Sequence, residues 1–127
     1  MLNFTVKQLA AELAARRVSS VEVTKYFIKR INALGKALNA FISVGEEQSL
    51  ALARAADQRL AAGKGGPLTG IPLAHKDIFC AKGWLTTCGS KILSNFVAPY
   101  DAHVIERFNQ AGAVIAGKTN MDEFAMG

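Results

Sequence analysis

The chain has 127 residues, half of them hydrophobic, and a formal net charge of +5. A chain of this length can bury roughly two-thirds of the surface that it exposes when unfolded, so we expect one compact unit with a real core. Its 11 glycines and 3 prolines, without any repeated tract, argue against a solenoid and against a disordered low-complexity protein.

The positive charge suits an acidic partner, but it is not concentrated. The longest basic runs are the pairs Arg16-Arg17 and Lys29-Arg30, so no polybasic arm is present and direct binding of nucleic acid is disfavoured. The N-terminus lacks the pattern of a signal peptide, and no window approaches the roughly 18 apolar residues of a membrane span. The expected location is cytoplasmic.

Cysteine and histidine give no sign of a metal site. Cys80 and Cys88 are eight positions apart, a spacing that fits neither a zinc knuckle nor a redox pair, so we expect two small buried thiols. His103 falls in the first turn of a predicted helix and is expected on the surface. We assign no metal to this chain.

The first third of the sequence predicts two amphipathic helices. TVKQ, beginning at Thr5, is a capping box and opens a helix that runs to about Arg17. SSVE, beginning at Ser19, repeats this signal, and Gly35 is placed to end the second helix.

A strand and a third helix follow. Residues 38–44 are rich in β-forming side chains and predict a strand. The segment EEQSLALARAADQRLAAG predicts a helix with acidic residues in its first turn and Gly63 at its end. The loop KGGPLTG then leads into an apolar strand at 71–78.

The last third alternates between helix and strand. A long connection contains a short helical turn near Lys91–Asn95, and Asp101 is a good N-cap for a helix that ends at Gly112. AVIAGK predicts a fully apolar strand, and Asn120 with Glu123 predicts the start of another helix. This order of strand, connection, helix and strand is typical of α/β layers with parallel neighbouring strands.

Lys76 is the unusual residue of the apolar strand at 71–78. Its neighbours on the same face are small or apolar, namely Pro72, Ala74 and Ile78. Burial against such neighbours disfavours the charged form of an amine and lowers its pKa, so that a neutral lysine could act as a general base.

From the residues alone three interpretations of Lys76 remain open, and the first is favoured. It could guard the edge of a sheet against aggregation, act as a general base, or form a structural ion pair with Asp77 or another carboxylate. His75 falls on the opposite face of the strand and is expected to be packed or hydrogen-bonded.

Two further polar groups are candidates for the vicinity of a substrate or a proton relay. The first is a small polar loop after the strand, which contains Thr86, Thr87, Gly89 and Ser90. Its glycine and hydroxyl groups could approach a substrate, but a plain turn without a role in the site is the favoured interpretation. Ser90 has no base paired with it in the sequence. Asp122 and Glu123 are explained by capping of a helix start, whereas a carboxylate at Glu123 that handles ammonia is the alternative.

Three ordered blocks go beyond these local patterns: GPLTGIPLAHKDIF, GWLTTCGSKIL and PYDAHVIERFNQAGAVIAGKTNMDEFAMG. Together they resemble the amidase-signature family, and within it the subunits that hydrolyse glutamine for tRNA-dependent amidation. The likeness covers essentially the whole chain and is strongest from Gly66 to Gly127.

The resemblance implies a mechanism. Lys76 would be the base of a Ser-Ser-Lys triad, acting through a relay serine on a nucleophilic serine that attacks the amide and releases ammonia, after which water hydrolyses the acyl-enzyme. Both serines of the family lie beyond NMDEFAMG, where this sequence stops at Gly127. We therefore expect the chain alone to be inactive, since it lacks the nucleophile and the oxyanion hole.

The resemblance also implies a fold and partners. Residues 1–127 would be the N-terminal part of one α/β amidase domain, mainly helical over 1–63 and with the lysine strand in an α/β segment over 64–127; the domain would be incomplete, with N-terminal helices and the first strands of a mixed sheet covered by helices. Glutamine would be the substrate, and the B and C subunits of an amidotransferase would complete a heterotrimer. Glu-tRNA(Gln), ATP and Mg would bind to the partner, with no cofactor in this chain.

Two alternatives remain. The chain could belong to a free amidase that hydrolyses small amides, which would release ammonia without partner subunits. It could also be a non-catalytic structural or interaction module, which would fold by itself and still bind partners.

Overall fold

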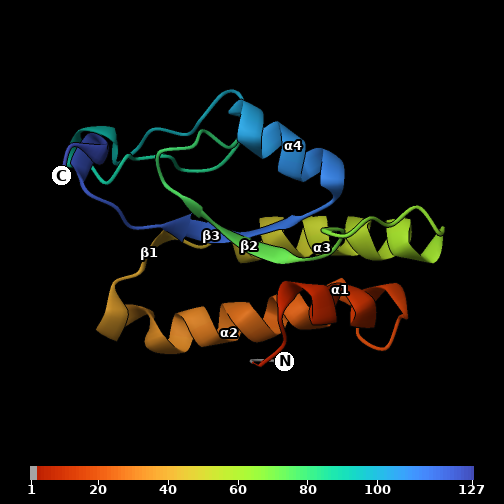
Figure 1. Cartoon of the computed structure of the whole chain (residues 1–127). Helices are drawn as coiled ribbons and strands as arrows, with labels where there is room; N and C mark the ends of the chain where they lie inside the picture. Colours follow the sequence, from red (N-terminus) through yellow and green to blue (C-terminus); the bar gives the residue numbers. More distant parts are fainter. Residues whose placement is uncertain (1–2) are drawn as a thin grey trace.

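A three-stranded sheet separates two layers in this computed structural model, which describes residues 3–127 (Figure 1). Helices α1 and α2 lie below the sheet in the view of Figure 1, whereas α4 and the long connection that precedes it lie above. The elements have these bounds: α1 Val6–Ala14, α2 Ser20–Leu38, β1 Phe41–Ser43, α3 Glu46–Ala61, β2 Pro72–Lys76, α4 His103–Ala111 and β3 Val114–Thr119, with 3₁₀ turns at Lys91–Leu93 and Glu123–Ala125.

Both predicted capping boxes are confirmed. The hydroxyl of Thr5 accepts a hydrogen bond from the backbone of Gln8 at the start of α1, and Ser19 does the same for Glu22 at the start of α2. In each box the side chain at the third helical position accepts from the backbone N–H of the cap in return. The two helix starts were therefore encoded locally.

The predicted ends of these helices are wrong. Helix α1 ends at Ala14 instead of Arg17, because Arg16 adopts a left-handed conformation with φ 57° and the N–H of Arg17 bonds back to Glu12. Helix α2 continues through Gly35 and ends where Asn39 turns left-handed at φ 48°. An asparagine tolerates this conformation and can end a helix as glycine does, and the sequence offered no glycine at Arg16.

Helix α3 ends as predicted, and it is anchored to α2 by a carboxylate. Gly63 adopts φ 70° after the last turn of α3. Asp57 of α3 accepts hydrogen bonds from the N–H groups of Ser20, at 2.6 Å, and Val21, at 3.2 Å. A negative charge at the N-terminus of α2 is favoured by the helix dipole, so this contact fixes how the two helices pack.

The sheet has the order β1-β3-β2, with β3 parallel to β2 and antiparallel to β1. The parallel pair confirms the α/β layering predicted from the alternation of elements, and the mixed sheet covered by helices agrees with the expected amidase-signature fold. Both outer strands are shorter than predicted. Strand β1 covers only part of 38–44, and β2 ends at Lys76 instead of residue 78.

A bulge in β3 changes the direction of its side chains. Leu73 of β2 pairs with Ile115, but the next residue, Ala74, pairs with Gly117, so Ala116 is an extra residue in β3. An interval of three residues places two side chains on opposite faces of a regular strand. Because of the bulge, Ile115 and Lys118 both point toward the layer of α4 and the connection, where each has its contacts.

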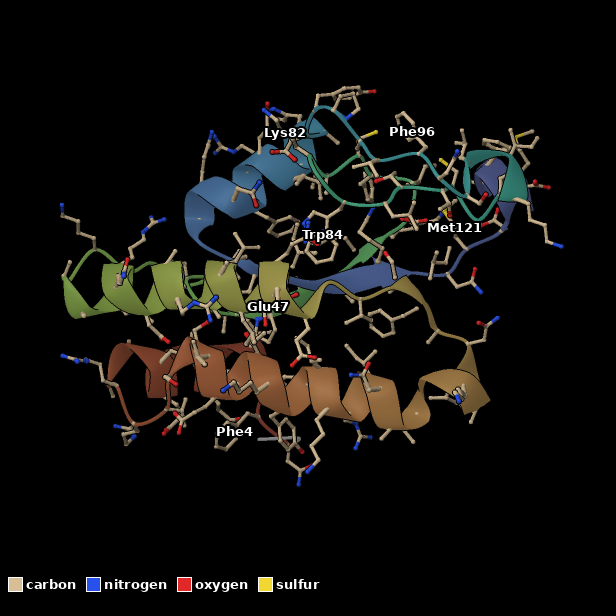
Figure 2. The ribbon with its side chains drawn as sticks, turned by 180° about the vertical axis from the view of Figure 1, so that it is seen from behind. Phe4, Glu47, Lys82, Trp84, Phe96 and Met121 are labelled. Atoms are coloured by element: carbon tan, nitrogen blue, oxygen red, sulfur yellow. The ribbon has the colours of Figure 1, made fainter. Side chains whose placement is uncertain are left out.

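Among the described residues the core forms two clusters, one on each side of the sheet. Below it, α1, α2 and the residue before β2 contribute the buried side chains Leu9, Leu13, Val23 and Ile71. Above it, the connection, α4 and β3 contribute Ala81, Trp84, Ile105 and Ile115. Figure 2 shows Trp84 reaching from the connection toward the sheet.

Three predictions about the last third need correction. Asp101 does not cap α4: its carboxylate accepts from the backbone N–H of Lys82 at 2.6 Å, and Ala102 takes the cap position. Asn120 does not open a helix, because its side chain binds the carbonyl of Asn39, and only a short 3₁₀ turn follows. The cysteines are free thiols that are partly exposed, not buried.

Other predictions for this region are confirmed. The helical turn near Lys91 is present, and α4 ends at Gly112, which has φ 76°. His103 is on the surface, beside Glu106.

Among residues 3–127 no helix has both the length and the apolar character needed to cross a membrane.

Candidate functional site

Lys76 is the last residue of β2, at the end of the parallel strand pair. The carboxyl ends of parallel strands are the usual place for ligand sites in α/β folds, because the connections that follow them converge there. Here the polar loop of residues 86–90 and the segment 121–124 approach this end, as the N–H of Phe124 donates to the carbonyl of Cys88 at 2.9 Å. In Figure 2, Met121 and Phe96 both lie at this end of the molecule.

The described residues do not bury the Lys76 amine, as the general-base interpretation would need, and they leave it as the favoured edge-strand interpretation has it. The side chain of Lys76 is 44% exposed, and Ala74 on the same face is exposed as well. The reason is that β2 lies at the edge of the sheet, and on this face Ala74 lines an open groove beside α2 instead of a closed core. This is the geometry that the edge-strand interpretation requires.

The charged partner of Lys76 is Asp122, not Asp77. The amine nitrogen of Lys76 is 3.9 Å from Asp122 Oδ1, and both side chains are well exposed. The pKa of the Asp122 carboxyl lies below its usual value, mainly because it accepts from the backbone N–H of Gly127, with a smaller contribution from the charge of Lys76. An exposed pair at this distance contributes little stability.

A second lysine at this end of the sheet was missed by the sequence analysis. Lys118 lies in the strand predicted as fully apolar, and its side chain is completely buried. Its amine donates to Asp77 Oδ1 at 3.0 Å, to the carbonyl of Phe79 at 3.0 Å and to Thr86 Oγ1 at 3.1 Å. All three N–H bonds of the ammonium group therefore have an acceptor.

The carboxylate of Asp77 connects this lysine to the polar loop. Its second oxygen accepts from the backbone N–H of Thr87 at 2.8 Å and from the hydroxyl of Thr87 at 2.5 Å. Asp77, Thr86 and Thr87 are all buried. Of the predicted loop residues, the two threonines therefore hold the loop in place and do not face solvent.

The remaining predicted residues form a second contact at the rim. The hydroxyl of Ser90 donates to Glu123 Oε1 at 2.7 Å, so the structure brings these two candidates together. Gly89 adopts φ 67°, and a Cβ at this position would lie 2.7 Å from the carbonyl oxygen of Met121. Glycine is thus required for the close approach of the loop to residues 121–124.

His75 is packed, as predicted. Its ring lies 5.3 Å from that of Phe108 in an edge-to-face arrangement, and the buried Nε2 atom has no hydrogen-bond partner. Burial lowers the pKa of His75, and the positive charge of Lys118 lowers it further. His75 is therefore a neutral core residue of the α4 layer.

Side chains that could bind a metal ion are not clustered in the described part of the chain. Within the described residues, no three His, Cys, Asp or Glu side chains are close enough together to bind a metal ion. An apolar groove of about 330 Å³ lies between α2 and the sheet. Its lining does not include Lys76 but includes Phe27, Leu34 and Ala74.

Comparison with known proteins identifies the class. Residues 22–127 match the family described as Amidase. The chain is 66% identical over its full length to the A subunit of glutamyl-tRNA(Gln) amidotransferase from Nitrosospira multiformis, and 63% identical to the same protein from Nitrosomonas europaea. It spans about a quarter of their length, 26% in each case.

Solved structures agree. The native peptide amidase from Stenotrophomonas maltophilia has a TM-score of 0.90 and 35% identity, over 96% of this chain and 26% of that one. An amidase family protein from Bacillus anthracis has a TM-score of 0.88 and 28% identity, over 96% of this chain and 25% of that one. The fold is that of an α/β amidase, and this chain belongs to the amidase-signature family.

Proposed function

We propose that this chain is the N-terminal part of an amide-hydrolysing protein that converts glutamine to glutamate and supplies ammonia for amidation of Glu-tRNA(Gln). The observation that carries the proposal is the 66% identity, over all 127 residues, to a protein named as part of the glutamyl-tRNA(Gln) amidotransferase. Lys76 stands at the end of a parallel strand, next to a rigid polar loop, where a substrate could reach its amine.

In this proposal Lys76 is the general base. It would accept the proton of a nucleophilic serine through a relay serine, and both serines would come from sequence beyond Gly127. Such sequence would also cover the exposed face of β2 and desolvate the amine, which a lysine needs before it can act as a base near neutral pH. The 127-residue chain by itself would then be inactive.

The proposed partners follow from the same likeness. The B and C subunits would form the cytoplasmic complex with the full-length protein, and the partner would bind ATP, Mg and the tRNA. The scattered basic residues of this chain are compatible with a tRNA that binds elsewhere.

The first test is to read the codons that follow Gly127. A glycine- and serine-rich block with two separated serines supports the proposal, whereas a stop codon directly after Gly127 contradicts a catalytic role. The second test measures ammonia release from glutamine by the full-length protein that contains this chain, with its partner subunits. The Lys76→Ala variant should lose about 100-fold or more in kcat, as expected for a general base.

A matched control is Lys82→Ala. Lys82 is exposed, like Lys76, and its side chain has no polar contact among the described residues. This variant should retain full activity. Equal activity of the Lys76 and Lys82 variants would contradict the role of Lys76.

A second candidate is a free amidase for small amides, favoured by the TM-score of 0.90 to a peptide amidase. The two candidates differ in their dependence on partners. Hydrolysis of a small amide by the full-length protein alone, without glutamine turnover in the complex, would favour the free amidase.

A further inference from the structure

Lys76 and Lys118 are two lysines at the same end of the sheet with opposite surroundings. His75 and Lys118 face each other as partners in the register of β2 and β3, and Lys76 follows directly. The Lys118 side chain has no exposed surface, whereas that of Lys76 is 44% exposed. Lys118 is therefore not available to react with a substrate, and its role must be sought in its contacts.

The contacts of Lys118 join three chain segments. Asp77 follows the end of β2, Phe79 begins the connection, and Thr86 belongs to the polar loop. One ammonium group from β3 thus holds the strand end and the loop together. Removing it would take the donor from three acceptors, of which those on Asp77 and Thr86 are buried.

Asp77 extends these contacts to the backbone on both sides. Its N–H donates to the carbonyl of Thr119 at 3.1 Å, and its own carbonyl accepts from Cys88 at 3.0 Å. Its carboxylate binds both the N–H and the hydroxyl of Thr87. The residue next to Lys76 is consequently fixed to β3 and to the loop at the same time.

The loop in turn holds the segment that faces the Lys76 amine. The carbonyl of Cys88 accepts from the N–H of Phe124 at 2.9 Å, and Ser90 binds Glu123 at 2.7 Å. Asp122, in this same segment, is the carboxylate 3.9 Å from Lys76. A continuous set of contacts therefore leads from Lys118 to both the backbone and the charged neighbour of Lys76.

A buried ion pair stabilises a fold less well than apolar side chains that fill the same space. Two apolar side chains of similar volume often give equal or greater stability, because ions lose their hydration on burial. The ion pair instead fixes the geometry of the groups around it, since charged hydrogen bonds hold their partners in a more specific arrangement than apolar contacts do.

We propose that Asp77 and Lys118 are positioning residues for amide hydrolysis, and that their buried pair fixes Lys76 and the polar loop in the reactive arrangement. This inference rests on the proposed function. Neither residue touches the substrate. Both act through Lys76 and the loop, and small displacements of reacting groups cost rate more than binding.

The test uses the full-length protein that contains this chain, in complex with its partners, and steady-state hydrolysis of glutamine. The double variant Asp77→Asn/Lys118→Met removes both charges together and keeps the volume. We expect kcat to fall about 100-fold, with KM changed less than about threefold, because an error in placement slows the reaction without removing a substrate contact.

A control variant in the core separates an effect on the position of Lys76 and the loop from a general loss of stability. Ile105→Val removes one methylene group from the core below α4, where Ile105 is completely buried and takes part in none of the hydrogen bonds of Asp77 and Lys118. It should lower the melting temperature without lowering kcat. An equal loss of kcat in this control would overturn the inference.

If the double variant does not fold, Thr86→Val provides the same test in milder form. Valine has the same shape as threonine but lacks the hydroxyl that accepts from Lys118. We expect kcat to fall about 3- to 10-fold at unchanged KM. A kcat within twofold of the wild type in either folded variant would overturn the inference. A wild-type complex that does not hydrolyse glutamine would instead overturn the proposed function.

Discussion

The amine of Lys118 lies 3.0 Å from the carboxylate of Asp77, and neither side chain has any exposed surface. The pair is surrounded by its own hydrogen-bond partners, so that every N–H bond of the ammonium group is used. A buried charge is tolerated only while its partner is present, because hydration by water is lost on folding.

Removing one member of this pair should therefore be worse than removing both. We expect Lys118→Met alone to lower the free energy of unfolding by about 3–5 kcal/mol, since Asp77 is then left as an uncompensated buried charge. The double variant Asp77→Asn/Lys118→Met should recover much of this loss. Urea denaturation of the wild type and both variants measures the difference, and equal stability of the single and double variants would contradict the pairing.

The pKa of His75 predicts a dependence of stability on pH. Burial and the charge of Lys118 lower the pKa of His75 in the folded state, so the unfolded state binds a proton more readily. Stability should be unaffected above the unfolded pKa of about 6.5 and should fall as the pH decreases below it, by at most about 1.4 kcal/mol per pH unit.

Denaturation at pH 7.5 and at pH 5.0 tests this expectation. His75→Leu should reduce the loss of stability between the two values. The control His103→Gln should not, because His103 is on the surface with its side chain 84% exposed. An unchanged pH dependence in His75→Leu would show that His75 does not cause it.

The sequence predicted the beginnings of elements better than their ends. Capping boxes at Thr5 and Ser19 are local signals, since each depends on residues three positions apart, and both are confirmed. Helix ends at Arg16 and Asn39 depend on a left-handed residue that is not glycine, and this choice is not evident from composition. Asp101 does not cap α4 because its carboxylate accepts instead from the backbone N–H of Lys82, which is distant in sequence.

The candidate site, too, could be predicted only where the signal in the sequence was local. Lys76 and the polar loop could be singled out from the sequence, but Lys118 could not, because a lysine at the end of an apolar strand usually points to solvent. Its burial follows from the bulge at Ala116, which changes the face of every later side chain in β3. The only local sign was the glycine before it, which often accompanies a bulge.

The hydroxyl of Thr87 offers a more conservative test of the loop. Thr87→Val keeps the shape but removes the donor to Asp77, and we expect the free energy of unfolding to fall by about 1–3 kcal/mol because a buried carboxylate loses a hydrogen bond. Thr87→Ser keeps the hydroxyl and should lose less than half as much. Thermal unfolding of both variants checks the order, and a serine variant as unstable as the valine variant would refute it.

Two glycines provide opposite predictions for the same substitution. Gly117 lies where β1 approaches β3, and a Cβ there would be 2.8 Å from Phe41 Cδ1 and 3.0 Å from the carbonyl oxygen of Ser43. Backbone atoms of β1 cannot move away without breaking the pairing of the two strands. Gly117→Ala should therefore lower the free energy of unfolding by about 1–3 kcal/mol, as overpacking of a core does.

Gly35 is the matched control, because it lies inside α2 and a Cβ there would meet nothing within 4 Å. Alanine favours the helix over glycine, so Gly35→Ala should raise the free energy of unfolding by about 0.5–1 kcal/mol. Urea denaturation of both variants measures the contrast in sign. A stabilising Gly117→Ala would mean that β1 does not approach β3 as closely as described, and a destabilising Gly35→Ala would mean that α2 is interrupted at the position where the sequence alone suggested its end.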